Sequence, residues 1–452
     1  MPALWLSTAL LPRGWAGSVR VSHAAGVIVG VEIGAAAAPG DETAAIGVPG
    51  LCNVHSHAFQ RGMAGLAERR GPADDDFWTW REVMYRFLAV LDPDDVQAIA
   101  ALAYAEMLES GFIRVGEFHY LHNDPQGRPY ADPAEMAVRI AAAAGATGIG
   151  LTLLPVFYAH ADFGGAPPKA GQRRFVTDPD GFARLVEASR AAVTGLAGAV
   201  VGVAPHSLRA VTPEELREVT TLSPQGPIHI HAAEQTGEVD ASLAWSGRRP
   251  VEWLLGNAGV DRRWCLIHAT HPTDAECDAL AMSGAVAGLC PITEANLGDG
   301  VFPAGRYLAA AGAMAVGTDS NILIDAAAEL RALEYAQRLA LRSRNILAGG
   351  EGHSVGAALF AAAQAGGARA MASDGRGIAV GAPADFVALG ADHPSLIGRA
   401  GDDLLDGWIF AAGREAVSGV WRAGRKVVAD GRHVDRARIL RDYRRVLEKV
   451  LA

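Results

Sequence analysis

Two histidines separated by a single residue, His55 and His57, follow a short apolar run that ends in Pro49-Gly50. Successive side chains of a strand point to opposite faces, so both imidazoles would lie on the same side, about 7 Å apart along the strand. Neutral imidazole is a common metal ligand, and two rings on one side can share an ion. The pair predicts a metal site, although two hydrogen-bonded strand histidines would produce the same pattern.

Strand-like apolar runs alternate with helix starts through the middle of the chain. A capping side chain or a proline marks helix N-termini at Asp92-Pro93, Asp132-Pro133, Asp178-Pro179, Thr212-Pro213 and Pro272-Thr273-Asp274. Eight candidate strands span residues 47–57, 113–119, 148–158, 200–206, 227–231, 264–268, 285–290 and 313–319. Eight strand–helix units predict an α/β fold, a (β/α)8 TIM-type barrel, and the count alone leaves an open doubly wound sheet as the alternative.

Most of these candidate strands end in a side chain that is capable of chemistry. The residues in question are His55, His57, Glu117, His119, Tyr158, His206, His231, His268 and Asp319. In barrels of this type the active site lies at the C-terminal ends of the strands. Histidines that only filled the core would be spread along the strands, so their position at the ends predicts a shared site.

The types of these residues indicate metal-assisted hydrolysis. His231 and Asp319 can join the first two histidines as ligands, and three His with one Asp suit Zn²⁺ while tolerating Fe²⁺ or Mn²⁺. Such an ion lowers the pKa of a bound water from about 16 to about 7. His268 is either a further ligand or a hydrogen-bond partner of that water. Glu234, three residues after His231, is interpreted as a proton carrier, the alternative being a solvated loop glutamate.

Charge and composition restrict the partners. The formal net charge is −10, half of the residues are apolar, and a fifth are charged. This balance argues against binding to nucleic acid or to an anionic membrane, so an anionic substrate must be attracted by local cations. Lysine occurs only at positions 169, 426 and 449, so these cations are arginines. The absence of a Cys-x-x-Cys pair and of a signal-peptide pattern predicts a cytoplasmic protein.

The two ends of the chain share a different pattern of short strand-like segments separated by glycines. Residues 1–48 and 376–429 are therefore predicted to pair into one small β-sandwich domain. The barrel would occupy residues 49–375, and residues 430–452 are predicted to form a C-terminal helix.

The order His55-x-His57, His231, His268 and Asp319 on eight βα units, with a terminal β domain, resembles the amidohydrolase superfamily over nearly the whole chain. Many members hold two metals bridged by a carbamylated lysine at the end of strand four. Here that strand ends at His206, and no lysine lies between positions 169 and 426. The resemblance therefore implies one divalent ion per subunit, Zn²⁺, held by His55, His57, His231 and Asp319.

Seven further segments resemble one deaminase branch of that superfamily: residues 55–66, 77–81, 116–120, 206–211, 231–235, 244–250 and 293–300. Members of this branch hydrolyse N-formimino-L-glutamate to N-formyl-L-glutamate and ammonia in histidine degradation. The resemblance implies catalytic roles for Glu234, His268 and Asp319. It implies substrate-binding roles for Gln60, Arg81, Tyr120, His206 and Arg209.

The implied substrate is a small dicarboxylate with an amidine-like head. Arg81 and Arg209 carry planar guanidinium groups that match carboxylates, although a surface salt bridge is the alternative for Arg81. The resemblance further implies a homodimer. Two other functions stay open: a deaminase acting on a nucleobase or another amidine, and a catalytically silent metal-binding barrel that serves as a scaffold.

Overall fold

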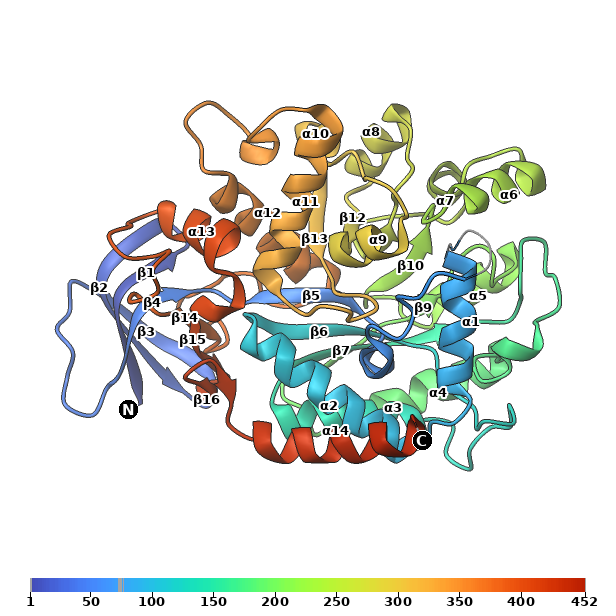
Figure 1. Ribbon diagram of the computed structural model, residues 1–452, viewed down its shortest axis with the longest axis horizontal. Helices are drawn as coiled ribbons and strands as arrows, with labels where there is room; N and C mark the ends of the chain where they lie inside the picture. Colours follow the sequence, from blue (N-terminus) through green and yellow to red (C-terminus); the bar gives the residue numbers. More distant parts are fainter. Residues whose placement is uncertain (1, 72–74, 76, 452) are drawn as a thin grey trace.

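Parallel strands form the centre of the molecule in a computed structural model that describes residues 2–71, 75 and 77–451 (Figure 1). One sheet contains β5 (Leu51–Ser56), β6 (Phe112–His119), β7 (Gly150–Phe157) and β8 (Val200–Val201), and β9 (Ala204–Pro205) also pairs with β7. The second sheet contains β10 (Ile228–Ala232), β11 (Trp264–His268), β12 (Val286–Leu289) and β13 (Ala313–Val316). All pairings within the two sheets are parallel, as predicted.

The two parallel sheets are neighbours along both of their edges. An isolated parallel bridge joins Ser56, at the end of β5, to Asp319, which follows β13. On the other side, isolated bridges join Val203 to Ile228 and Ser207 to His231. The ends of strands that are far apart in the sequence, β5, β10 and β13, are thereby brought to one place.

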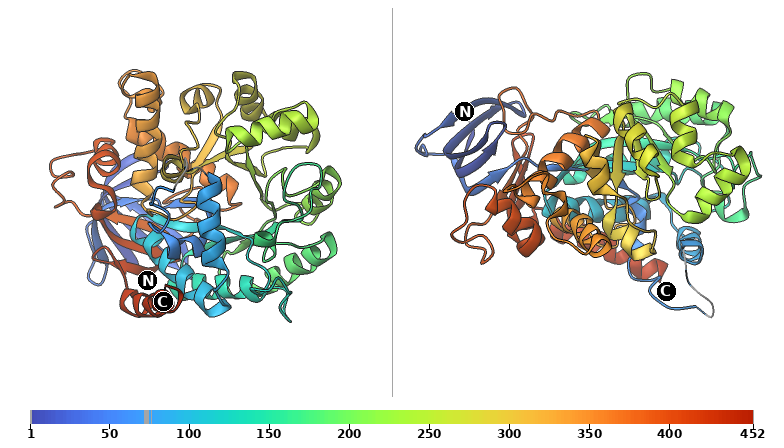
Figure 2. Two further views of the ribbon diagram at one scale, coloured as in Figure 1. Left: turned by 45° about the vertical axis from the view of Figure 1, so that its right-hand side comes forward. Right: turned by 90° about the horizontal axis from the view of Figure 1, so that it is seen from above.

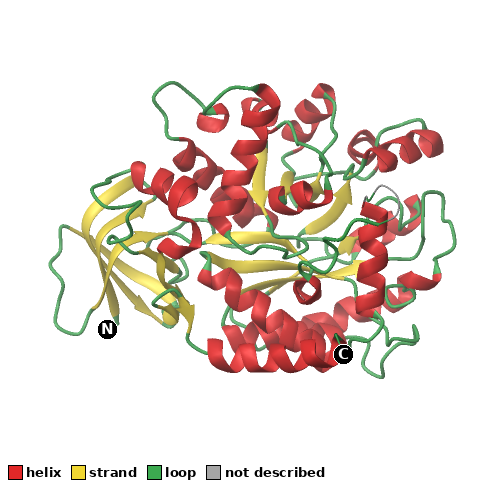
Figure 3. Cartoon of the chain, in the orientation of Figure 1, coloured by secondary structure: helices red, strands yellow, loops and turns green. Residues whose placement is uncertain are grey.

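Helices cover the outside of these strands (Figures 2 and 3). They are α1 (Phe77–Leu88), α2 (Pro93–Glu109), α3 (Glu135–Thr147), α4 (Pro179–Ala192), α5 (Pro213–Thr221), α6 (Thr236–Ser246), α7 (Pro250–Asn257), α8 (Asp274–Ser283), α9 (Pro291–Leu297), α10 (Ala304–Ala309), α11 (Ala326–Leu341), α12 (Val355–Ala370), α13 (Asp403–Gly407) and α14 (Arg436–Val450). None of the described helices is both long and apolar enough to cross a lipid bilayer.

Four of the five predicted helix starts are confirmed by their capping contacts. The side chains of Asp92, Asp178, Thr212 and Thr273 each accept a hydrogen bond from a backbone N–H in the first turn of α2, α4, α5 and α8. The start predicted at Asp132 is wrong, because its carboxylate accepts from the N–H of Ala134 within a preceding turn and α3 begins only at Glu135.

Two predicted strands are divided in the structure. The strand expected over residues 47–57 is two strands, because Pro49-Gly50 separates β4 (Glu42–Val48) from β5. The strand expected over residues 200–206 is split into β8 and β9. The other six predicted strands agree with the observed ones except at their ends.

The two ends of the chain meet in a mixed eight-stranded sheet (Figure 2). Its order is β17 (Arg432–His433), β16 (Arg425–Ala429), β15 (Val417–Arg422), β14 (Phe386–Leu389), β4, β1 (Ala3–Leu11), β2 (Gly14–Ala24) and β3 (Val27–Ile33). The junction is the antiparallel pairing of β4 with β14, in which Val48 lies opposite Val387. A separate apolar cluster that includes Leu6, Phe386 and Trp421 joins side chains of the N-terminal strands to side chains of β14 and β15.

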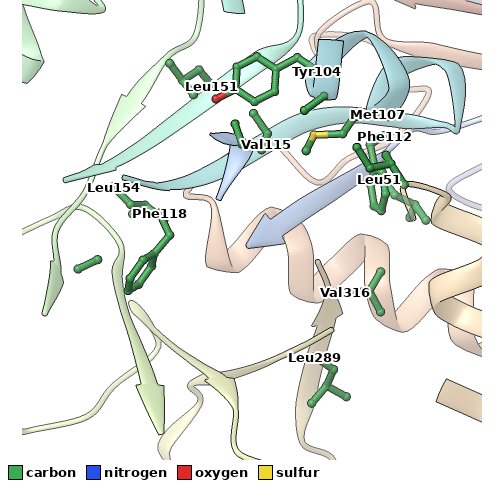
Figure 4. Packing of buried hydrophobic residues seen from close by; sticks show 14 of the residues in the cluster. Leu51, Tyr104, Met107, Phe112, Val115, Phe118, Leu151, Leu154, Leu289 and Val316 are labelled. Atoms are coloured by element: carbon green, nitrogen blue, oxygen red, sulfur yellow. The ribbon is translucent and has the colours of Figure 1, made fainter. Parts of the chain in front are cut away.

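The main apolar core lies between the parallel strands and the helices around them (Figure 4). Tyr104 and Met107 of α2 are buried with Val115 of β6. Burial of a large apolar side chain stabilises a fold by roughly 1.5–3 kcal/mol, so this packing holds the strands rigidly. Rigid strands keep the side chains at their ends in fixed positions.

One glycine shows how closely α12 approaches the strands. A Cβ atom at Gly366 would lie 1.9 Å from the carbonyl oxygen of Met314 in β13. Because this neighbour is backbone, we expect Gly366→Ala to lower the free energy of unfolding by at least ~1–3 kcal/mol. Gly237→Ala is a matched control, since a Cβ there meets nothing within 4 Å in α6. Thermal unfolding of both variants checks the expectation, and equal Tm values for the two would contradict it.

Candidate active site

Four buried side chains converge at the strand ends. His55 and His57 come from the end of β5, His231 from β10 and Asp319 from the loop after β13, and one ligand atom from each lies within 4.8 Å of all the others. Nε2 of His231 is 3.0 Å from Nε2 of His55. Oδ1 of Asp319 is 3.3 Å from Nε2 of His55 and 3.2 Å from Nε2 of His57. Ligands about 2.0–2.1 Å from a tetrahedral ion lie about 3.3 Å from one another, so these spacings fit a metal ion.

Backbone carbonyl groups fix the orientation of two of the rings. Nδ1 of His57 lies 3.0 Å from the carbonyl oxygen of Phe118, and Nδ1 of His231 lies 2.9 Å from that of His206. A carbonyl only accepts, so each Nδ1 donates its proton and the neutral ring presents the lone pair of Nε2 to the cluster. A ligand histidine commonly has such an outer hydrogen bond.

Burial keeps His55 and His231 in the neutral form that binds a metal. It lowers the pKa of His55 to about 3 and holds the pKa of His231 well below its ordinary value. These neutral nitrogens and the carboxylate of Asp319 face one another in a buried cluster, an arrangement that a divalent cation stabilises. The residues present therefore fit a metal ion.

His268 and Glu234 lie beside this cluster. Nε2 of His268 is 3.8 Å from Oε1 of Glu234 and 3.8 Å from Oδ2 of Asp319, too long for direct hydrogen bonds. Burial lowers the pKa of His268, but the charges of Glu234 and other carboxylates outweigh it and raise this pKa to about 10. A bound cation would oppose this rise. Burial also raises the pKa of the Glu234 carboxyl, which suits a group that gives and takes protons near neutral pH.

The backbone around the cluster is strained. Ala233, His268, Ala269, Asp319 and Asn321 all have positive φ angles between 42° and 64°. Such angles cost a residue with a Cβ roughly 1–3 kcal/mol, and they gather where a functional geometry is imposed by surrounding structure. Asn321 supplies part of that structure, since its side chain donates to Ser56 Oγ and to the His57 carbonyl.

A cavity opens in front of the cluster. It is lined by His57, Gln60, Trp80, Arg81, Met84, Tyr85, Tyr120, Tyr158, Phe175, His206, Arg209, His231, Glu234, Leu297 and Asp319. Its mixture of aromatic walls with a few polar groups suits a small organic molecule.

Positive charge lies on the wall of this cavity. Arg209 is only 7% exposed, and its nearest carboxylate oxygens are on Glu234 at 3.8 Å and Glu238 at 4.0 Å. These distances exceed hydrogen-bond length, so Arg209 keeps donors for a ligand. The guanidinium carbons of Arg81 and Arg209 lie 4.4 and 5.7 Å from the ring centre of Trp78. Two guanidinium groups thus flank one indole ring.

Neutral hydrogen-bonding groups complete the wall. Nε2 of Gln60 donates to the hydroxyl of Tyr120 at 2.9 Å, and that hydroxyl donates to Sδ of Met84 at 3.3 Å. Oε1 of Gln60 is buried and has no hydrogen-bond partner among the described residues. Nδ1 of His206 lies 3.1 Å from Oγ of Ser207, and burial holds the pKa of His206 well below its ordinary value.

The residues predicted from the sequence are brought together in one region. Nine of them line the cavity, and His55 and His268 lie buried beside it. His229, two residues before His231 on the same strand, bonds to the carbonyl of Ala370 through its Nε2 at 2.8 Å and is not part of the cluster. Glu117 accepts from the N–H of Ala58 at 2.7 Å and does not line the cavity.

Several residues of the site were not identified from the sequence. Met84 and Tyr85 of α1 and Phe175 form part of the wall, and Glu294 contacts His268. The aromatic residues carry no signal, because their side chains would suit any buried position. Glu294 had two available signals, its position shortly after the end of a predicted strand and its place in the segment 293–300, which resembles the deaminase branch.

Comparisons with known proteins agree with this geometry. Residues 46–432 match the model of the "Amidohydrolase family", and residues 1–45 match "Formimidoylglutamate deiminase HutF, N-terminal domain". A formimidoylglutamate deiminase of Pseudomonas aeruginosa is 49% identical over 453 residues, covering 100% of both chains. A 5-methylthioadenosine/S-adenosylhomocysteine deaminase of Natronomonas pharaonis is 28% identical, covering 77% of this chain and 74% of the relative.

Two solved structures are similar along almost the whole chain. The crystal structure of an amidohydrolase from Brucella melitensis has a TM-score of 0.96 at 55% identity, covering 100% of both chains. A zinc-bound adenosine deaminase from Xanthomonas campestris has a TM-score of 0.83 at 24% identity, covering 99% of this chain and 98% of that chain, and shows the shared fold only. The strand-end cluster and these full-length similarities lead to one assignment: the chain belongs to the amidohydrolase family and, within it, to the formimidoylglutamate deiminases.

Proposed function

We propose that this chain hydrolyses N-formimino-L-glutamate to N-formyl-L-glutamate and ammonia, a step of histidine degradation. The observation that carries the proposal is the placement of Arg209 and Arg81 in the cavity that contains the His/His/His/Asp cluster. A substrate with carboxylates at one end and an amidine at the other matches this distribution of charge. The full-length relative from Pseudomonas aeruginosa supports the same activity.

The ligands of the metal would be His55, His57, His231 and Asp319, holding one Zn²⁺ per subunit. Three imidazoles and a carboxylate suit this ion, and no lysine occurs in the segment that would have to supply a bridging ligand to a second one. The chemistry that the ion supplies when bound is Lewis-acid activation of a water molecule near neutral pH.

Three residues of the chain would move protons. Asp319 and His268 accept a proton as water attacks the formimino carbon, and His268 also orients that water. Glu234 passes a proton to the nitrogen, the C–N bond breaks, and ammonia leaves. Nε2 of His268 lies 3.8 Å from an oxygen of each carboxylate, so the three groups are close enough to act on the same reacting atoms.

The remaining polar groups would bind the substrate. Arg209 and Arg81 offer paired N–H donors to the two carboxylates. Gln60, Tyr120 and His206 add neutral hydrogen bonds, and the free Oε1 of Gln60 can accept from a substrate N–H. The indole of Trp78 lies near both guanidinium groups and can stabilise their positive charge.

We propose that the domain architecture resembles that of the amidohydrolase family, a barrel with a small β domain. The two parallel sheets, which touch along both edges, would form one (β/α)8 barrel over residues 49–375. Residues 1–48 and 376–429 would form a β sandwich around the separate apolar cluster, with a terminal helix in residues 430–452. A homodimer in the cytoplasm, acting on a small molecule and not on nucleic acid or membranes, stays a prediction.

Ammonia release from a panel of substrates tests the function. We expect turnover of N-formimino-L-glutamate and at least ~100-fold lower kcat/KM for a neutral amidine of similar size, because each lost charge-assisted hydrogen bond weakens binding by ~1.5–3 kcal/mol. Faster release from adenosine or from the neutral amidine would assign the chain to a different deaminase activity. No release from any member of the panel by the metal-loaded protein would favour a catalytically silent role.

The hydroxyl of Tyr120 is expected to make a smaller contribution. Tyr120→Phe removes the hydroxyl that accepts from Gln60 and donates to Sδ of Met84, without changing the shape of the wall. A neutral hydrogen bond contributes ~0.5–1.5 kcal/mol, so KM should rise about 2- to 10-fold with kcat little changed. Steady-state kinetics measure both constants, and a large fall in kcat with constant KM would give Tyr120 a different role.

A further inference from the structure

We propose that Glu294 and Asp299, which we call the acid pair, are positioning residues for the two proton-transfer groups of the site. Glu294 holds the ring of His268, and Asp299 holds the turn that carries Glu234 by way of Gln235. This inference rests on the proposed deaminase chemistry for the roles of His268 and Glu234. Neither member of the acid pair lines the cavity, so neither is assigned contact with substrate.

Glu294 lies in α9, directly behind His268. Its Oε1 is 3.2 Å from Nδ1 of His268 and accepts the backbone N–H of Cys290 at 2.8 Å. Glu294 is only 4% exposed. Its contact with the N–H of Cys290 fixes the carboxylate independently of its contact with the ring of His268. An ionised carboxylate only accepts hydrogen bonds, so it holds the proton of His268 on Nδ1.

The proton on Nδ1 determines the hydrogen-bonding role of the other ring nitrogen of His268, Nε2. Nε2 has no hydrogen-bond partner among the described residues and lies 3.8 Å from both Glu234 and Asp319. In the neutral ring, which a nearby cation favours, Nδ1–H donates to Glu294 and Nε2 presents a lone pair to the space where the nucleophile must lie. The backbone of His268 has a φ of 64°, so the side-chain contact also secures a strained position.

Asp299 lies at the end of the segment 290–299, after α9, and stabilises the turn that carries Glu234. Its backbone N–H donates to the carbonyl of Glu294 at 2.9 Å, which ties the two acids together. Its Oδ1 accepts a short hydrogen bond from Nε2 of Gln235, the residue after Glu234. Asp299 is 4% exposed, and burial raises the pKa of its carboxyl to about 9. Asparagine is therefore a neutral mimic of it near pH 7.

The turn around Glu234 is held from two sides. Oε1 and Oε2 of Glu238 accept the backbone N–H groups of Ala233 and Glu234, both at 3.2 Å, and Ala233 has a φ of 50°. Gln235 precedes the first residue of α6 but makes no side-chain capping contact with it, so its amide is committed to Asp299. The segment of residues 290–299 therefore links the supports of His268 and Glu234.

Variants of Glu294 separate positioning from simple structural support. Glu294→Gln keeps an oxygen that can accept from Nδ1–H but removes the charge, and Glu294→Ala removes both. We expect kcat to fall about 10-fold in the first and about 100-fold in the second, the range seen for groups that orient an active-site histidine. KM should change less than about threefold, and the metal content should be unchanged.

Glu334→Gln is the matched control. Glu334 is also fully buried and accepts two backbone N–H groups, those of Ile346 and Leu347 at 3.0 Å, but it does not line the cavity. If Glu294 only supported the fold, Glu294→Gln, Glu294→Ala and Glu334→Gln would all have a lower Tm, and their kcat values would be similar to one another. A kcat of Glu294→Gln within twofold of the wild type would overturn the proposed role of Glu294.

The tautomer of His268 is measured independently of activity. In ¹⁵N-histidine NMR spectra of the metal-loaded protein, the signals of His268 are those lost in His268→Asn. We expect a protonated Nδ1 in the wild type and in Glu294→Gln, and an unprotonated Nδ1 in Glu294→Ala. An Nδ1 that stays protonated in Glu294→Ala would also overturn the proposal. If the wild type released no ammonia from N-formimino-L-glutamate, the proposed function would fail, whereas this spectrum would still decide what Glu294 does.

A double-variant cycle tests Asp299. Asp299→Ala and Gln235→Ala should each lower kcat about 10-fold, and the double variant should lose no more than either one, because the two changes remove the same contact. Asp299→Asn should stay within about threefold of the wild type. Additive losses, or a wild-type kcat in Gln235→Ala, would overturn the role assigned to Asp299.

Discussion

Replacing Glu234 by glutamine should reduce kcat by roughly 10²–10⁴, the usual contribution of general acid–base catalysis. Glutamine has nearly the same shape and can keep the neighbouring contacts, but it cannot give a proton to the leaving nitrogen. Glu234 is not among the four clustered ligand residues, so the metal content of the variant should equal that of the wild type. Single-turnover assays of ammonia release, combined with elemental analysis, measure both quantities.

A buried glutamate outside the cavity provides the control for Glu234→Gln. Glu276 is 6% exposed, close to the 5% of Glu234, and it pairs with Arg249. Glu276→Gln should reduce stability more than activity. Near-normal turnover by Glu234→Gln would remove Glu234 from the proton-transfer role, and a parallel loss of metal would instead indicate a ligand.

Replacing Arg209 by alanine should mainly weaken substrate binding. Hydrogen bonds to a charged group contribute ~1.5–3 kcal/mol, so KM for N-formimino-L-glutamate should rise roughly 10- to 100-fold. Arg209 also lies 3.8 Å from Glu234, and removal of its positive charge should raise the pKa of that carboxyl further. A smaller decrease in kcat is therefore expected as well.

Two companion variants make the Arg209→Ala experiment specific. Arg209→Lys keeps the charge but not the planar pair of donors, so its KM should lie between those of the wild type and the alanine variant. Arg263→Ala removes an arginine that pairs with Asp261 away from the cavity, and its kinetics should match the wild type. An unaltered KM in Arg209→Ala would argue against carboxylate recognition by this residue.

The sequence predicted those features that depend on local patterns. Helix caps such as Asp92 and Thr212 were correct because the capping interaction involves residues only three apart. The strand-end histidines could be grouped because parallel strands in repeated βα units bring their C-terminal ends to one side. The pairing of the chain ends was predicted from their similar composition, although not its register.

Features that depend on distant residues could not be predicted. His229 contacts the carbonyl of Ala370, a residue 141 positions away, and no local pattern predicts this contact. The break at Pro49-Gly50 separates two strands of different sheets, which a continuous apolar run concealed. The positions of Trp78 between two arginines and of Glu294 behind His268 require tertiary packing, which no local pattern encodes.

The central claim is that one divalent ion, held by three histidines and an aspartate, is required for the hydrolysis of N-formimino-L-glutamate. The most direct test is to titrate the chelator-treated, metal-free protein with Zn²⁺ while ammonia release is recorded. We expect no release without metal and full activity at one equivalent per chain. Ammonia release by the metal-free protein, or a requirement for two equivalents, would contradict the account.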